Sequence, residues 1–194
     1  NLLKASLPGF NDDKGVCVIT DFALNRIDQL NYNKRWHFPL IDDQNGVSLE
    51  RIWFNKGTQD STNWHSAAEA VGYATPGYKN SQSLNEQLPV KDFVITPEVF
   101  SPDNDGYNDV ITFNISMNEP GYILNAKIYN EAGQLVRNLV KSKLLAPEDS
   151  FMWDGITDKN DKASVGIYIV YAEAFNPEGK TKKYKKAFVV ASKL

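Results

Sequence analysis

The feature that most constrains the fold is a series of short segments in which apolar and polar residues alternate. The segment VITFNISM (110–117) places Ile111, Phe113, Ile115 and Met117 on one side and polar side chains on the other. Such an alternation is typical of a β-strand with one buried face. Strand-like segments of this kind also include GVCVIT (15–20) and VSLERIWF (47–54).

Turn residues separate these segments at short intervals and predict hairpins. NAKIYNEAGQLVRNLV (125–140) reverses at Gly133, and GIYIVYAEAF (166–175) joins YKKAFVVA (184–191) through Asn176–Lys180. Helical periodicity is nearly missing, and only STNWHSAAEAVGY (61–73) could form a single helical turn. The predicted fold class is therefore all-β, with two consecutive immunoglobulin-like (Ig-like) β-sandwiches.

A polar, aperiodic segment divides the chain. KNSQSLNEQLPVKD (79–92) has the composition of a linker and carries a proline before the next strand. We expect a partial sandwich over 1–80, a linker over 81–92 and a complete sandwich over 93–194. The first part is short for a sandwich, so we expect it to be incomplete at its N-terminus.

Composition excludes several classes of function. A net charge of −3 argues against binding to nucleic acid, and no apolar run approaches the roughly 20 residues that cross a bilayer. The single cysteine, Cys17, is expected to be buried and allows no internal disulfide, which suits a bacterial surface protein. Because the first residue is Asn1 rather than Met, we expect a longer parent protein whose upstream domains adjoin this region.

Three motifs in the first half carry a family resemblance. They are GVSLERI (46–52), NWHSA (63–67) and ATPGYKN (74–80). With these motifs the first half resembles the second part of the bacterial lamin tail domain, an Ig-like β-sandwich. The resemblance implies a spacer or adhesion module.

The second half resembles another family. FSPDNDGYNDVITF (100–113), KIYNEAGQLVRNL (127–139) and a terminal KKAFVVA (185–191) are similar to the Ig-like C-terminal modules of Bacteroidetes surface proteins. Such modules look like sorting signals of the type IX secretion system. The resemblance implies export across the outer membrane of a Gram-negative bacterium, followed by release or attachment at the cell surface.

The loop SPDNDGYND raises the question of a metal site. Asp103, Asp105 and Asp109 supply oxygen atoms at short spacing around a glycine, as a calcium loop requires. The acid that an EF-hand places at loop position 12 would fall at Asn114, which is neutral. We therefore favour a polar turn, with weakly bound calcium as the alternative and no other cofactor. The same two readings apply to a second acidic loop, formed by Asp154, Asp158, Asn160 and Asp161.

Catalytic chemistry finds little support in the sequence. His37 and His65 each follow a tryptophan and lack a third zinc ligand at a recognisable spacing, so we expect both to hydrogen-bond loops. Ser66 beside His65 lacks the pattern of a hydrolytic triad. The pairs Asp12–Asp13 and Asp42–Asp43 point to opposite faces of an extended chain, so neither pair would flank a glycosidic bond. We predict that this region is not an enzyme.

The last strand is rich in lysine. Lys182, Lys183, Lys185 and Lys186 lie in a segment without acids, although the chain as a whole is acidic. Lysines on an edge strand discourage pairing with foreign strands, and an exposed basic edge is also a surface that a partner can recognise. We expect these lysines to bind the type IX translocon and outer-membrane shuttle proteins. One alternative is a polysaccharide-binding module with exposed aromatic rings, and another is the tail of an enzyme whose catalytic domain lies upstream.

Overall fold

The structure, a computed structural model, describes residues 9–84 and 92–193. All regular elements of any length are β-strands, which confirms the predicted all-β class. Helical structure among the described residues is limited to three single 3-10 turns, namely η1 (Lys34–Trp36), η2 (Ser61–Asn63) and η3 (Glu69–Val71). The one helical turn expected over 61–73 is thus two 3-10 turns, separated by the short strand β4 (Trp64–Ser66). None of the described helices is long and apolar enough to cross a membrane.

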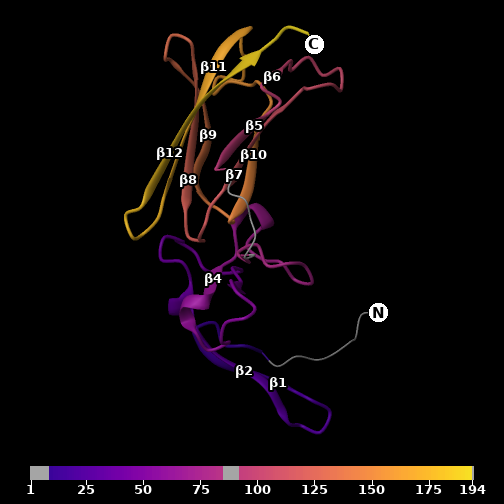
Figure 1. The fold of residues 1–194 in the computed structure, drawn as a ribbon, viewed down its shortest axis with the longest axis vertical. Helices are drawn as coiled ribbons and strands as arrows, with labels where there is room; N and C mark the ends of the chain where they lie inside the picture. Colours follow the sequence, from indigo (N-terminus) through magenta and orange to yellow (C-terminus); the bar gives the residue numbers. More distant parts are fainter. Residues whose placement is uncertain (1–8, 85–91, 194) are drawn as a thin grey trace.

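The second half forms a β-sandwich of two sheets, in which every strand pair is antiparallel except the short parallel contact between β6 and β12 (Figure 1). One sheet has the order β10-β7-β5 and consists of β10 (Glu148–Trp153), β7 (Ile111–Ser116) and β5 (Phe93–Thr96). The other has the order β6-β12-β11-β8-β9 and consists of β6 (Val99–Phe100), β12 (Thr181–Val190), β11 (Gly166–Phe175), β8 (Ile123–Asn130) and β9 (Leu135–Leu144). We call residues 92–193 the signal sandwich, after the resemblance of the second half to sorting signals.

The core of the signal sandwich follows from the alternation in the sequence. Ile111, Phe113 and Ile115 of β7 are fully buried, and the polar residues between them lie on the other face. Aromatic rings fill much of the space between the sheets. Phe113 is 5.1 Å from Phe151, and Trp153 is 5.8 Å from Phe188, measured between ring centroids. Burial of rings of this size is the main source of stability in a domain of about 100 residues.

The two predicted hairpins are present. In the β8–β9 hairpin the N–H of Gly133, at φ +75°, donates to Asn130 O at 2.9 Å. In the β11–β12 hairpin the N–H of Gly179 donates to Asn176 O at 3.0 Å. Both glycines occupy the left-handed region, which other residues adopt at a cost, so the turn positions were readable from the sequence.

The described part of the first half, residues 9–84, is less regular, and we call it the first module. It contains two separate two-stranded sheets, β1 (Lys14–Thr20) with β2 (Arg26–Asn33), and β3 (Leu49–Arg51) with β4. The strand expected over 47–54 is therefore much shorter than predicted. Cys17, on β1, was expected to be buried but is only half-buried, because it lines an open hollow between the hairpin and residues Arg51 and Trp64 of the other sheet.

The first part of the predicted linker is packed against the first module. Gln82 is fully buried, and the N–H of Leu84 donates to Ile52 O at 3.1 Å. Residues 85–91 lie outside the described residues, so the position of the domain boundary remains a prediction.

Candidate partner-binding surface

The last strand, β12, forms most of one edge of the five-stranded sheet. It pairs with β11 along its whole length, but β6 covers only Val189 and Val190 on the other side. Between Thr181 and Phe188 the outer side of β12 therefore has no neighbouring strand among the described residues. The prediction of a final edge strand holds for eight of its ten residues, and the last two are protected by β6.

The direction of the free backbone groups follows from the β6 contact. The N–H of Val189 donates to Glu98 O at 2.9 Å, so it points away from β11. Because backbone groups alternate along a strand, the N–H groups of Lys183, Lys185 and Ala187 point the same way. These three residues present unpaired donors and acceptors at the open edge, which is the arrangement that accepts an added strand.

The four predicted lysines divide between the two faces of β12. Lys182 and Lys186 share a face with the buried Phe188, whereas Lys183 and Lys185 lie on the outer face of the sheet. The sequence suggested a single row of lysines, but because side chains alternate along a strand, the four lysines form two pairs on opposite faces of the sheet.

The lysines also differ in their partners. Lys183 Nζ lies 3.4 Å from Glu173, whose carboxylate raises the pKa of Lys183, and both side chains are exposed. Lys182 Nζ lies 3.9 Å from Asp92. Exposed pairs of this kind contribute little to stability, so these lysines remain open to exchange partners. Within the described residues no ion pair involves Lys185 or Lys186.

A shallow hollow of about 370 Å³ lies beside Lys185 on the outer face of the sheet. Its lining consists of Tyr129, Gly133, Ile169, Tyr171 and Lys185. Tyr171 and Lys185 are register partners on β11 and β12, so the hollow begins next to the open edge. A segment added to β12 could place an apolar side chain here. The sequence did not indicate this hollow, because its lining comes from three strands and a turn.

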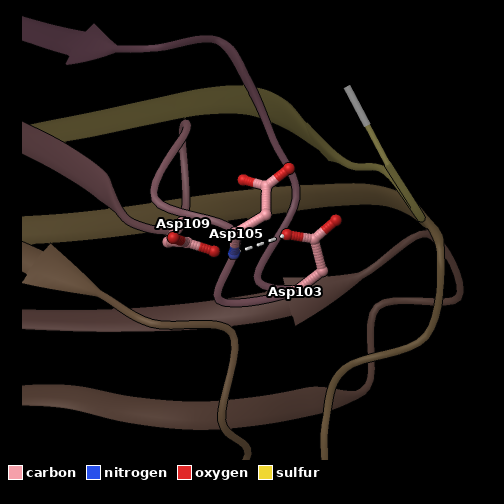
Figure 2. Close-up of side chains that lie close together, drawn as sticks. All are labelled: Asp103, Asp105 and Asp109. Atoms are coloured by element: carbon pink, nitrogen blue, oxygen red, sulfur yellow. Dashed lines mark hydrogen bonds between the residues drawn. The ribbon is translucent and has the colours of Figure 1, made fainter.

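The predicted metal ligands do come together. One oxygen each of Asp103, Asp105 and Asp109 lies within 4.8 Å of the others, and Figure 2 shows the three side chains on one loop. Calcium takes six to eight oxygen ligands, so three carboxylates would need further donors. Whether the loop binds calcium remains a prediction.

The same carboxylates already accept backbone hydrogen bonds. Asp109 accepts from the N–H groups of Asn104 and Gly106, the latter at 2.8 Å, and Asp105 accepts from Tyr107 N–H at 2.8 Å. Asn104 at φ +63° benefits from this support, because a residue with a side chain adopts the left-handed region at a cost, whereas Gly106 at φ +90° adopts its conformation freely. These contacts favour a structural turn. In the second acidic loop, Asp158 is turned toward Asn138 in the same way and accepts from its N–H at 3.0 Å.

Both histidines contact Ser66, but the contacts do not form a catalytic arrangement. His37 Nδ1 lies 2.9 Å from Ser66 Oγ, and His65 Nδ1 lies 2.9 Å from Ser66 O. Ser66 is fully buried, and its Oγ also accepts from Phe38 N–H at 2.9 Å. Both histidines therefore contact a residue of strand β4 rather than the loops that the sequence suggested, and the Ser66 hydroxyl is buried and used within the fold. Burial lowers the pKa of both imidazoles.

The two acidic pairs line one hollow, which the sequence did not foresee. Asp12, Asp13, Asp42 and Asp43 surround a polar depression of about 470 Å³. Asp13 is paired with Lys34, and this contact lowers the pKa of Asp13. All four carboxylates are exposed or partly exposed. No three of these four carboxylates come as close together as those of Asp103, Asp105 and Asp109.

Comparison with known proteins identifies the second half. A family model, the CHU_C type IX secretion signal domain, matches residues 94–190, which is half of the chain. The chain belongs to this family. The CHU_C match coincides with the signal sandwich and confirms the resemblance drawn from the motifs of the second half. A type IX secretion signal directs a protein out of the cell through the type IX machinery, so β12, the hollow beside Lys185 and the loop of Asp103 belong to a sorting signal.

Solved structures with similarity to the chain include three bacterial proteins. PorU from Porphyromonas gingivalis, in a dimeric latent form, is 23% identical with a TM-score of 0.41, and the match covers 57% of this chain and 10% of PorU. PorZ, a surface component of the type IX secretion system of the same organism, is 21% identical with a TM-score of 0.33, covering 51% of this chain and 11% of PorZ. FlgD from P. aeruginosa is 21% identical with a TM-score of 0.35, covering 42% of this chain and 62% of FlgD. The chain thus spans less than two thirds of each of these proteins, and no curated protein sequence matches it.

Proposed function

We propose that this chain is the non-catalytic C-terminal region of a secreted or surface-attached protein of a Gram-negative bacterium, and that β12 is the element that the secretion machinery reads. The observation that carries the proposal is the open edge of β12 between Thr181 and Phe188, within a domain that belongs to the CHU_C family. A sheet edge of this length supplies backbone hydrogen bonds to an added strand, whatever its sequence.

The surroundings of the edge supply selectivity. Lys183 and Lys185 flank it on the outer face, and the hollow lined by Tyr129 and Tyr171 lies next to Lys185. A partner strand with an acidic residue and an apolar residue on the same face, two positions apart, would match this surface. We propose that the partner is a translocon or an outer-membrane shuttle protein that carries such a strand.

The first module serves, in this proposal, as a lamin-tail-like spacer between upstream domains and the signal. Its motifs at 46–52, 63–67 and 74–80 support the assignment. In the structure these motifs form β3, β4 and the loop that leads to Gln82, and they lie together, because β3 pairs with β4 and the Thr75 hydroxyl of the loop donates to Glu50 of β3.

The export role can be tested with the whole region. Residues 1–194 are fused to a periplasm-targeted fluorescent protein and expressed in a bacterium with a working type IX system. We expect fluorescence in the medium or at the cell surface, and its retention in the periplasm of a strain without the translocon. If the fusion stays in the periplasm while an authentic signal exports the same reporter, the sorting role is wrong.

The charge reversals Lys183→Glu and Lys185→Glu test the surface itself. Both residues are exposed and lie outside the core, so the double variant should fold normally. We expect it to reduce export, whereas the matched variant Lys141→Glu with Lys162→Glu, at exposed positions away from β12, should leave export unchanged. Equal export by both double variants would exclude charge recognition at β12.

A further inference from the structure

The outer face of the five-stranded sheet is covered at one end by the first module. Phe38, which is almost fully buried, packs against Ile123 of β8 and Leu144 of β9, with Ile41 and Phe175 at the margin of the cluster. Ile123 and Phe175 are register partners, and their strand neighbours point into the core of the sandwich. The cluster therefore lies on the sheet surface, as a second and smaller core between the two halves of the chain.

The turn that precedes β8 is shaped for this contact. Gly121 has φ +89°, and a Cβ built there would lie 3.2 Å from His65 Nε2 and 3.5 Å from Phe38 Cε2. The rings of Phe38 and His65 are themselves in contact, with centroids 5.1 Å apart. The absence of a side chain at Gly121 thus allows the first module to approach the backbone of the signal sandwich.

A buried polar connection accompanies the apolar contact. Gln82 is fully buried, and its Nε2 lies 3.4 Å from Leu145 O in the signal sandwich. Its N–H donates to Glu50 Oε2 at 3.0 Å. The Glu50 carboxylate is buried as well and also accepts from Thr75 and Ser81 hydroxyls. The loop that carries Gln82 is therefore fixed by Glu50 and placed against the other half.

The first module has little core of its own. Within residues 9–84, the only cluster of buried hydrophobic side chains is the one that Phe38 shares with Ile123 and Leu144. The two sheets of the module have two strands each, and two-stranded sheets are at best marginally stable alone. Several apolar side chains of the β1–β2 hairpin, including Val16 and Ile27, are exposed.

We propose that the end of the sheet formed by Gly121, Ile123 and Leu144 is an obligatory docking surface, and that its partner is the first module of the same chain. The first module takes its structure only on this surface. In turn it holds the signal sandwich so that the C-terminus lies at the opposite end, away from the module (Figure 1). The inference does not depend on the export role, because it concerns folding and orientation alone.

Hydrogen exchange of the full chain tests the docking surface, since it follows both halves separately. The variant Ile123→Asp places a carboxylate among the apolar side chains of the shared cluster, and burial of a charge among such side chains is costly. The matched control is Ile167→Asp, which lies on the same outer face, on β11, but is 52% exposed. We expect at least about 100-fold faster exchange in β3, β4 and the Gln82 loop of Ile123→Asp, with β7 and β11 within about tenfold of wild type. Exchange rates in both halves of the control variant should equal those of the wild type.

Two outcomes would overturn the proposal. If β3 and β4 keep wild-type protection from exchange in a folded Ile123→Asp variant, the first module folds without the docking surface. If Ile123→Asp and Ile167→Asp accelerate exchange equally, the effect is not specific to the shared cluster. If Ile123→Asp unfolds the whole chain, the variant Phe38→Ala provides the test, because it removes the same contact from the first module and leaves the signal sandwich unaltered in sequence. Loss of protection in β3 and β4 with β7 and β11 intact supports docking, and unchanged protection in β3 and β4 refutes it.

Discussion

Strand addition at β12 makes a sharp prediction for the variant Ala187→Pro. Ala187 is exposed, and its N–H points away from β11, as does that of Val189, which donates to Glu98 O at 2.9 Å. Proline lacks an N–H and is tolerated on edge strands where the missing donor faces outward. The substitution therefore removes a donor that the folded chain does not use but that an added strand would need.

The expected magnitudes separate binding from folding. We expect the free energy of unfolding to change by no more than about 1 kcal/mol, because no hydrogen bond of the sheet is lost. A partner strand would lose one hydrogen bond, a net contribution of about 0.5–1.5 kcal/mol, and would also meet the proline ring. Together these effects should weaken binding by about tenfold or more. The neighbouring variant Lys186→Pro should instead cost about 2 kcal/mol or more of folding stability, because its N–H faces β11 and leaves the partner carbonyl unpaired.

Two measurements complete this test. Thermal unfolding of the purified chain reports the effect on the fold, and export of the fluorescent fusion reports recognition. Ala187→Val is the matched control, because it keeps the N–H and favours a strand. If Ala187→Pro retains its melting temperature and exports as efficiently as Ala187→Val, recognition does not use strand addition at this edge.

Three further predictions concern side chains near the described surfaces. Burial raises the pKa of Tyr184 to about 12, and its hydroxyl lacks a hydrogen-bond partner among the described residues. Because the folded state favours the neutral phenol, the free energy of unfolding should be at its full value below pH 10 and should fall as the pH rises toward 12. In thermal melts at alkaline pH, Tyr184→Phe should make this fall shallower. At neutral pH the variant should be as stable as the wild type, or more stable by up to about 1 kcal/mol. An equally steep alkaline loss in Tyr184→Phe would contradict this account. Burial lowers the pKa of His65 below its ordinary 6.5, so protonation is disfavoured in the fold, and the docked first module should lose stability as the pH falls below that value. His65→Asn should reduce this acid sensitivity in tryptophan-fluorescence melts, and an unchanged slope would show that other groups cause it. Asp109→Ala removes the acceptor for Asn104 and Gly106 N–H groups and should cost about 1 kcal/mol, whereas millimolar calcium should leave the melting temperature of the wild type unchanged. A calcium-dependent rise in melting temperature that Asp109→Ala abolishes would instead establish the metal site.

Local pattern was sufficient for much of the signal sandwich. The alternation over 110–117 gave β7 and its buried face, and the turns at Gly133 and Gly179 gave the two long hairpins. These features depend on residues close in sequence, whose periodicity and backbone preferences act within one strand or turn. The motifs of the second half also indicated a type IX sorting module, which the CHU_C match confirms. The acidic loop was found for the same reason, because its three aspartates lie within seven residues.

What the sequence alone determined is therefore the all-β class, the strands and hairpins of the signal sandwich, its family and the lysine-rich last strand. Tertiary structure decided which neighbours those strands have. It set β6 against the end of β12, brought His37 to Ser66, and buried Gln82, which belongs to a segment that has the composition of a linker. The physical reason is that each of these contacts joins residues far apart in the chain. Their energy depends on which surfaces meet, and a single segment carries no record of the surface that will cover it.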